Sequence, residues 1–120
     1  QMGAAEWLKQ ALDGVPSIGI GAGIIAVQKH FSNVFGLGSE FAVDGSQFDR
    51  LFVDGADFPL GSLNVRVMAT PGHTSDGVSY LIGDAVFVGD TLFAPQAGTG
   101  RCDFPGSAAA TPYRSIHRLY

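Results

Sequence analysis

Short apolar runs separated by glycine-containing pairs fill residues 51–88, and this pattern constrains the fold more than any other feature. In residues 63–67 apolar and polar side chains alternate strictly, as in a strand with one face on a core and one on solvent. The Asp-Gly, Gly-Ser and Gly-Asp pairs at 54–55, 61–62 and 83–84 tolerate the positive φ that tight two-residue turns need. We therefore expect antiparallel-type strands joined by these turns, at residues 51–53, 58–60, 63–69, 78–82 and 85–88.

Helical periodicity lies on both sides of this strand-rich part. Residues 4–13 and 21–35 place apolar side chains near helical spacing, and residues 15–20 between them form a short strand pattern. After a long loop, Thr111 and Pro112 predict the N-cap and first position of a last helix. The sequence therefore predicts an α/β (α+β) protein with one mixed sheet layer and flanking helices.

Composition places the chain among globular proteins and excludes several classes of partner. Its 120 residues are 46% hydrophobic, which is enough to bury a core. A net charge of −4 with two lysines leaves no basic stripe, so we expect no nucleic-acid partner. Apolar runs fall short of the roughly 20 residues that span a bilayer, so we expect no membrane partner. Cys102, the single cysteine, allows no intrachain disulfide, which favours the cytoplasm or another reducing compartment.

The two ends of the sequence both lie within helix-like patterns. Residue 1 is glutamine, and the last residues carry no helix stop signal. We expect residues 1–120 to be a single partial domain that is truncated at both ends. A processed or tagged natural domain is the alternative.

A histidine and an aspartate, His73 and Asp90, each follow a strand-like apolar run. Pro71 fixes φ and Gly72 permits a sharp turn, so this bend presents the His73 imidazole. A carboxylate at the end of an apolar strand needs a partner, and a metal ion shared with the histidine would serve. Two alternatives remain: an incidental histidine on a turn, and an aspartate that caps the next backbone amides.

Other polar residues near these two have supporting interpretations. The hydroxyl of Thr70 or Thr74 would hydrogen-bond the loop or the second ring nitrogen of His73, which fixes the tautomer. Asp84 also follows a glycine, but it lies in the predicted hairpin turn and is interpreted as a turn residue.

Residues 70–74 (Thr-Pro-Gly-His-Thr) and 87–92 (Phe-Val-Gly-Asp-Thr-Leu) make the sequence resemble the metallo-β-lactamase fold superfamily. Residues 98–104 (Gly-Thr-Gly-Arg-Cys-Asp-Phe) are similar to its persulfide dioxygenase and glyoxalase II-like branch, and residues 113–116 match the following helix there. The resemblance implies that the fold is a partial metallo-β-lactamase αββα sandwich.

The same resemblance implies roles for individual residues. His73 and Asp90 match two metal ligands of the superfamily, where the aspartate bridges two zinc ions or completes a two-histidine, one-carboxylate iron site. Arg101 matches a basic residue that meets the glutathione part of the substrate, and a loop-ordering salt bridge to Asp103 is the alternative. The superfamily's His-x-His-x-Asp-His motif is absent from the sequence, and the resemblance implies that it would precede Gln1.

The function implied is that of a metal-dependent enzyme acting on a small-molecule thiol or glutathione conjugate. The first interpretation is a persulfide (sulfur) dioxygenase with mononuclear Fe²⁺. The alternative is a thioester hydrolase similar to hydroxyacylglutathione hydrolase, with one or two Zn²⁺ ions that activate water. In a third interpretation the chain alone is a catalytically inactive half-fold, whose open sheet face favours a homo-oligomer.

Overall fold

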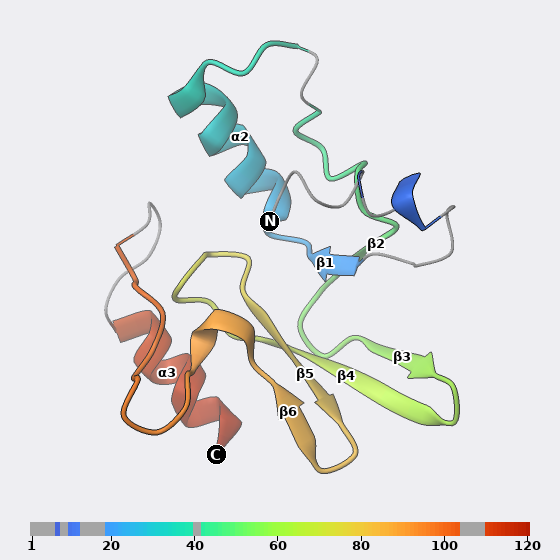
Figure 1. Ribbon diagram of the computed structural model, residues 1–120, viewed down its shortest axis with the longest axis vertical. Coiled ribbons are helices and arrows are strands. Elements are labelled where there is room, and N and C mark those ends of the chain that lie inside the picture. The colour runs from blue at the N-terminus through green and yellow to red at the C-terminus, as the bar shows by residue number, and fades with distance from the viewer. Residues whose placement is uncertain (1–6, 8–9, 13–18, 40–41, 104–109) are drawn as a thin grey trace. The chain divides into compact units, whose positions relative to one another are not determined.

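The chain forms two units, Gln1–Phe52 and Val53–Tyr120 (Figure 1). In this computed structural model the described residues are 7, 10–12, 19–39, 42–103 and 110–120.

In the first unit, two short strands pair in parallel. Strand β1 (Gly19–Gly21) lies beside β2 (Arg50–Phe52), with Ile20 opposite Leu51. Parallel neighbours need a crossover connection, and helix α2 (Ile24–Phe35) lies within it. The helix ends at Gly36, whose φ of 59° is left-handed and whose N–H bonds the Ser32 carbonyl.

A buried amide holds the long return loop of this unit against α2. The Gln28 carbonyl oxygen accepts a bond from the Gly45 N–H at 2.9 Å. Its NH₂ group donates to the Gln47 side chain at 2.9 Å, and Gln47 donates to the Ala42 carbonyl at 2.8 Å. Because Gln28 is fully buried, these bonds satisfy polar groups that would otherwise be costly.

The second unit is built on a four-stranded antiparallel sheet. Its strands follow one another in chain order, from green β3 to orange β6 in Figure 1. Leu60 pairs with Leu63 and Ile82 with Ala85, so the first and last hairpins have two-residue turns, while residues 70–77 connect the two middle strands. The elements are β3 (Asp57–Leu60), β4 (Leu63–Ala69), β5 (Val78–Ile82), β6 (Ala85–Phe87), the 3₁₀ helix η1 (Gly89–Thr91) and helix α3 (Ala110–Leu119).

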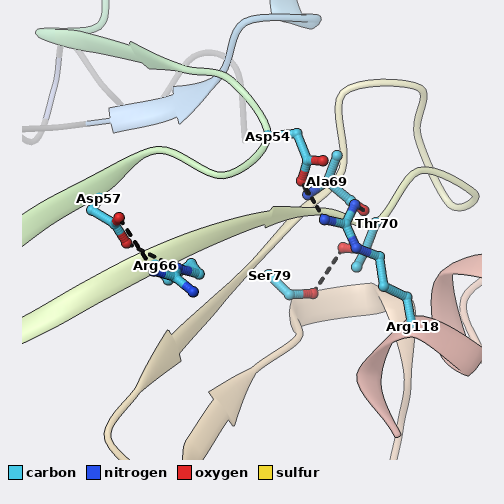
Figure 2. Close-up of polar contacts among 7 residues, drawn as sticks. All are labelled: Asp54, Asp57, Arg66, Ala69, Thr70, Ser79 and Arg118. Atoms are coloured by element: carbon cyan, nitrogen blue, oxygen red, sulfur yellow. Dashed lines mark hydrogen bonds and ion pairs between the residues drawn. The ribbon is translucent and has the colours of Figure 1, made fainter.

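The alternation in β4 decides which face of this sheet is buried. Val65 and Val67 are buried, while Asn64 and Arg66 between them are exposed. Arg66 forms an ion pair at 3.1 Å with Asp57 on the neighbouring strand β3. Figure 2 shows the two side chains facing each other. The predicted inward apolar face is therefore confirmed for the two valines and wrong for Leu63, which is 52% exposed at the start of the strand.

The mixed α and β fold class is confirmed, and the strands at 63–69 and 78–82 match residue for residue. The strands expected at 51–53, 58–60 and 85–88 and the helix expected at 21–35 are present, with ends that differ by one to three residues. Three further details differ. Within the described residues the strands form two sheets instead of one mixed layer. The pair at 54–55 joins no hairpin, because β2 and β3 belong to different sheets. Thr111 is not the N-cap, because α3 already includes Ala110.

Two other predictions of secondary structure lie mostly outside the described residues. The helix expected at 4–13 is described only at residue 7 and residues 10–12, and the strand expected at 15–20 only from residue 19 onward. In the part of the chain that the structure describes, no helix is long and apolar enough to cross a membrane.

The two valines provide a test of this core. Val67→Ala removes two methyl groups from a fully buried position and should lower the free energy of unfolding by about 2 kcal/mol. Leu63→Ala, on the same strand but 52% exposed, should change it by less than about 0.5 kcal/mol. Denaturant unfolding followed by circular dichroism measures both, and equal losses would contradict the buried-face assignment.

Candidate metal-binding site

Three buried hydroxyl groups join the segments that carry His73 and Asp90. Thr70, at the end of β4, and Ser79, on β5, have their hydroxyl oxygens 2.8 Å apart, and Figure 2 shows these two side chains pointing toward each other. The Thr91 hydroxyl donates to the Thr70 hydroxyl at 3.4 Å. Because Thr70 begins the bend before His73 and Thr91 directly follows Asp90, this cluster fixes the two segments relative to each other.

The hydrogen bond at one ring nitrogen defines the tautomer of His73. Nδ1 lies 2.8 Å from the backbone carbonyl oxygen of Arg101. A carbonyl oxygen only accepts, so Nδ1 carries the proton and donates it. In the neutral ring the lone pair is then on Nε2. Metal-binding histidines have this arrangement, with one nitrogen donating to a carbonyl or carboxylate and the other facing the ion.

The partner of Nδ1 corrects one prediction. From the sequence, the hydroxyl of Thr70 or Thr74 was predicted to bond either the loop or this ring nitrogen. In the structure the nitrogen bonds the Arg101 carbonyl instead. The Thr70 hydroxyl bonds neither the loop nor the ring, but Ser79 on β5 and Thr91 in η1. Thr74 stabilises the bend through its backbone carbonyl, which accepts the Gly72 N–H at 3.0 Å.

Asp90 lies on the Nε2 side of the ring. Its Oδ2 atom is 3.6 Å from His73 Nε2, which is too long for a hydrogen bond. Two ligands of one tetrahedral ion, with bonds of 2.0–2.2 Å, lie about 3.4 Å apart. The two side chains are 27% and 45% exposed, so an ion could reach them. An imidazole nitrogen and a carboxylate oxygen at this separation fit zinc and ferrous iron alike.

The alternative role of Asp90 as a cap has no support in this geometry. Asp90 lies inside η1. Its carboxylate accepts no hydrogen bond from the N–H of Thr91 or Leu92, both of which lie in the described part of the chain, and the Thr91 N–H bonds the Val88 carbonyl instead. Asp84 lies in the two-residue turn between β5 and β6, as expected.

One loop contacts both predicted ligands. The Gly100 N–H donates to the Asp90 carbonyl at 3.0 Å, and the next residue, Arg101, accepts from His73. Gly100 is buried, and a Cβ atom there would lie 2.9 Å from His73 Nδ1 and still closer to the Asp90 carbonyl oxygen. Only glycine fits this approach. The sequence showed Gly100 as part of a glycine-rich motif but not as a residue in contact with the site.

The side chain and the backbone carbonyl of Arg101 have different partners. Its guanidinium forms two bonds to the Asp103 carboxylate, both at 2.6 Å. These bonds lower the pKa of Asp103 and raise that of Arg101. The loop-ordering salt bridge considered from the sequence is therefore present, and both side chains are largely exposed. A substrate contact by Arg101 stays a prediction.

A residue missed by sequence reasoning is Asp54, which was interpreted as part of a turn. Its Oδ1 atom accepts the Ala69 N–H at 2.8 Å and lies 2.8 Å from an Arg118 nitrogen. The hydrogen bonds from the Ala69 N–H and from Arg118 both lower the pKa of Asp54, and the bond from Ala69 has the larger effect. An Asp-Gly pair looks like a turn in any sequence, so no local signal identifies this role.

The predicted pair does not complete a metal site by itself. Among the residues described, no group of three or more His, Cys, Asp and Glu side chains could hold one ion. The other two histidines, His30 and His117, are exposed on α2 and α3. Each ring contacts an aromatic neighbour, Phe31 and Tyr113 respectively.

Comparisons with known proteins give these observations a family context. The sequence model of the metallo-beta-lactamase superfamily matches residues 2–120. Glyoxylase B2 of Dictyostelium discoideum is 52% identical over 101 residues, which cover 83% of this chain and 35% of that protein. A hydroxyacylglutathione hydrolase of Brucella ovis is 47% identical over 73 residues, covering 59% of this chain and 27% of the relative.

A solved structure agrees with these relatives. The crystal structure of ETHE1 from Myxococcus xanthus superposes with a TM-score of 0.55 and 42% identity, over 60% of this chain and 31% of that one. The resemblance to the glyoxalase II-like and persulfide dioxygenase branch fits these neighbours. The chain spans only about a third of the length of the curated relatives it matches.

The contact of Gly100 with both ligands provides a test. Gly100→Ala should push the loop away from the ring and break the bond between His73 Nδ1 and the Arg101 carbonyl. Long-range ¹H–¹⁵N correlation spectra of the imidazole measure this, because the two tautomers have different nitrogen shifts. Thr99→Ala, at an exposed neighbour, should leave the Nδ1–H tautomer in place. Unchanged His73 signals in Gly100→Ala would contradict the description.

Proposed function

We propose that this chain, which belongs to the metallo-beta-lactamase superfamily, supplies two metal ligands to an enzyme that acts on glutathione-type thiol derivatives. One observation carries the proposal: His73 Nε2 and Asp90 Oδ2 lie 3.6 Å apart. The Arg101 carbonyl holds the opposite ring nitrogen at 2.8 Å, so Nε2 keeps the lone pair that a metal requires.

The remaining ligands are proposed to lie outside these 120 residues. A catalytic zinc site needs three protein ligands and a facial-triad iron site also needs three, whereas the described residues bring together two. The chain matches only 35% of one relative and 27% of another, which leaves ample length in such proteins for further ligands. The residues 1–120 are thus proposed to be one part of a longer enzyme.

The first proposed reaction is sulfur dioxygenation of a persulfide with one ferrous ion. Its support is the similarity of residues 98–104 to that branch together with the structural match to ETHE1. When bound, the ion would supply open positions for substrate and O₂. The chain's own part is to orient His73 through the Arg101 carbonyl and to provide the Asp90 carboxylate.

The second proposed reaction is zinc-dependent hydrolysis of a thioester. Its support is the 47% identity to a hydroxyacylglutathione hydrolase, and the same histidine and aspartate suit zinc. Metal analysis and O₂ uptake of the longer protein separate the two reactions. One iron per chain with O₂ consumption supports the dioxygenase, and two zinc ions without O₂ consumption support the hydrolase.

Arg101 is proposed to bind a carboxylate of the glutathione moiety. Its guanidinium already holds a carboxylate in the two-bond geometry that suits such a ligand, with Asp103 as the present partner. This ion pair is largely exposed, and exposed pairs contribute little to stability, so a substrate carboxylate can replace Asp103 without large cost.

The identity of the ligands is tested by paired substitutions in the longer protein. Asp90→Ala and His73→Ala should each remove bound metal and activity, because each takes away a donor atom of the pair. Asp84→Ala, in the hairpin turn, should leave metal content largely intact. Metal content by mass spectrometry and turnover decide the matter. Loss of metal in Asp84→Ala but not in Asp90→Ala would show that Asp84, and not Asp90, is the ligand.

The substrate contact is tested by changing only the Arg101 side chain. Arg101→Ala keeps the backbone carbonyl that orients His73, so metal content and kcat should stay near their wild-type values. KM for a glutathione conjugate should rise about 10-fold, since a charge-assisted bond to the substrate is lost. Asp103→Ala serves as the control and should not raise KM. An unchanged KM in Arg101→Ala would leave only the salt-bridge role.

The isolated chain is tested directly. The purified 120-residue chain should show no turnover with added Fe²⁺ or Zn²⁺, because two donor atoms bind a divalent ion poorly. Activity in this chain that disappears on His73→Ala would contradict the proposal that further ligands are needed.

A further inference from the structure

We infer that helix α3 is a positioning element for the metal ligand His73, an inference that rests on the proposed metal-binding role of that residue. Pro112, Ser115 and Arg118 are spaced three residues apart along α3, which places them toward one side of the helix. Each contacts a different residue in the short segment 69–72 that leads directly to His73.

The central contact is made by the Ser115 hydroxyl. It donates to the Pro71 carbonyl at 2.6 Å, and Ser115 is only 5% exposed. A serine within a helix commonly bonds a carbonyl of its own preceding turn. Here the hydroxyl instead bonds a carbonyl two residues before His73. Removing the hydroxyl would leave that carbonyl without this donor in a part-buried place.

The next contact fixes the residue directly before His73. Gly72 is buried, and a Cβ atom on it would lie 2.7 Å from the Pro112 Cβ atom and 2.8 Å from its Cα atom. Its φ of 152° is also one that residues with side chains rarely adopt. The backbone of the bend therefore lies directly on the first turn of α3.

The third contact holds the end of β4. Arg118 donates to the Ala69 carbonyl at 3.3 Å and forms an ion pair with Asp54 at 2.8 Å. Asp54 in turn accepts the Ala69 N–H at 2.8 Å. Figure 2 shows Asp54 and Arg118 converging on Ala69. Arg118 on α3 thus bonds the Ala69 carbonyl directly. The Ala69 N–H bonds the Asp54 carboxylate, which is itself paired with Arg118.

These contacts determine where the imidazole lies. The segment before His73 is fixed by α3, while the ring is fixed by the Arg101 carbonyl. Helix α3 also packs against η1, the element that contains Asp90. One helix therefore contacts both segments that carry the predicted ligands. A change on this side of α3 should alter the separation of Nε2 and Oδ2, and with it the affinity for a metal.

The test measures metal affinity in the longer protein with Co²⁺, whose visible spectrum reports ligand geometry. Ser115→Ala should weaken Co²⁺ binding about 10-fold or more and change the spectrum, as expected when a group that orients a ligand is lost. Ser115→Thr retains the hydroxyl and should restore binding to within about 2-fold. Arg114→Ala, on the exposed side of the same helix, is the matched control and should leave affinity and spectrum unchanged.

A second variant covers the case in which Ser115→Ala does not fold. Arg118→Gln removes the ion pair with Asp54 at an exposed position and should also weaken Co²⁺ binding and change the spectrum. If both variants fold and bind Co²⁺ as the wild type does, the inference is overturned. If only Arg118→Gln folds, weaker Co²⁺ binding with a changed spectrum supports the inference, and wild-type binding with an unchanged spectrum overturns it.

The variant His73→Ala separates this inference from the proposed function. If His73→Ala leaves Co²⁺ affinity unchanged, the proposed metal site fails and the positioning role fails with it. If His73→Ala abolishes binding while the α3 variants bind normally, the metal site stands and only the role of α3 is contradicted.

Discussion

The hydrogen bond between His73 Nδ1 and the Arg101 carbonyl is the interaction on which the rest of the site depends. It places the proton on one ring nitrogen and so leaves the lone pair on the nitrogen that is near Asp90. The bond requires the 98–103 loop to approach the ring closely, and Gly100 permits this because a side chain there would collide with both ligand segments. The proposed donor atom for a metal, Nε2, is thus defined by a backbone carbonyl and by the absence of a side chain at Gly100.

Three further groups of contacts support this arrangement of His73 and Asp90. The buried hydroxyls of Thr70, Ser79 and Thr91 join the ends of β4 and β5 to η1. Helix α3 holds the bend before His73, and the loop that contains Gly100 holds the ring. The predicted ligand pair is partly exposed, whereas the hydroxyl cluster that joins its two segments is buried and hydrogen-bonded.

The local parts of the fold could be predicted from sequence, and the reasons are physical. Strands 63–69 and 78–82 follow from alternation and from glycine at the turns, which act within a few residues. His73 and Asp90 could be predicted as a pair because each follows a strand-like apolar run, and β4 and β6 run in the same direction on either side of β5. The parallel pairing of β1 with β2 could not be predicted, because its partners are far apart in sequence. The roles of Asp54 and of the Arg101 carbonyl were missed because a distant backbone contact leaves no signal in residue type.

We propose that His73 and Asp90 bind one metal ion through Nε2 and a carboxylate oxygen. A crystal structure of the longer protein, with the ion located by its anomalous scattering, tests this proposal. We expect the ion to bond His73 Nε2 and an Asp90 carboxylate oxygen at about 2.0–2.2 Å, with Nδ1 still on the Arg101 carbonyl. An ion bound elsewhere, or bound through Nδ1, would contradict the account.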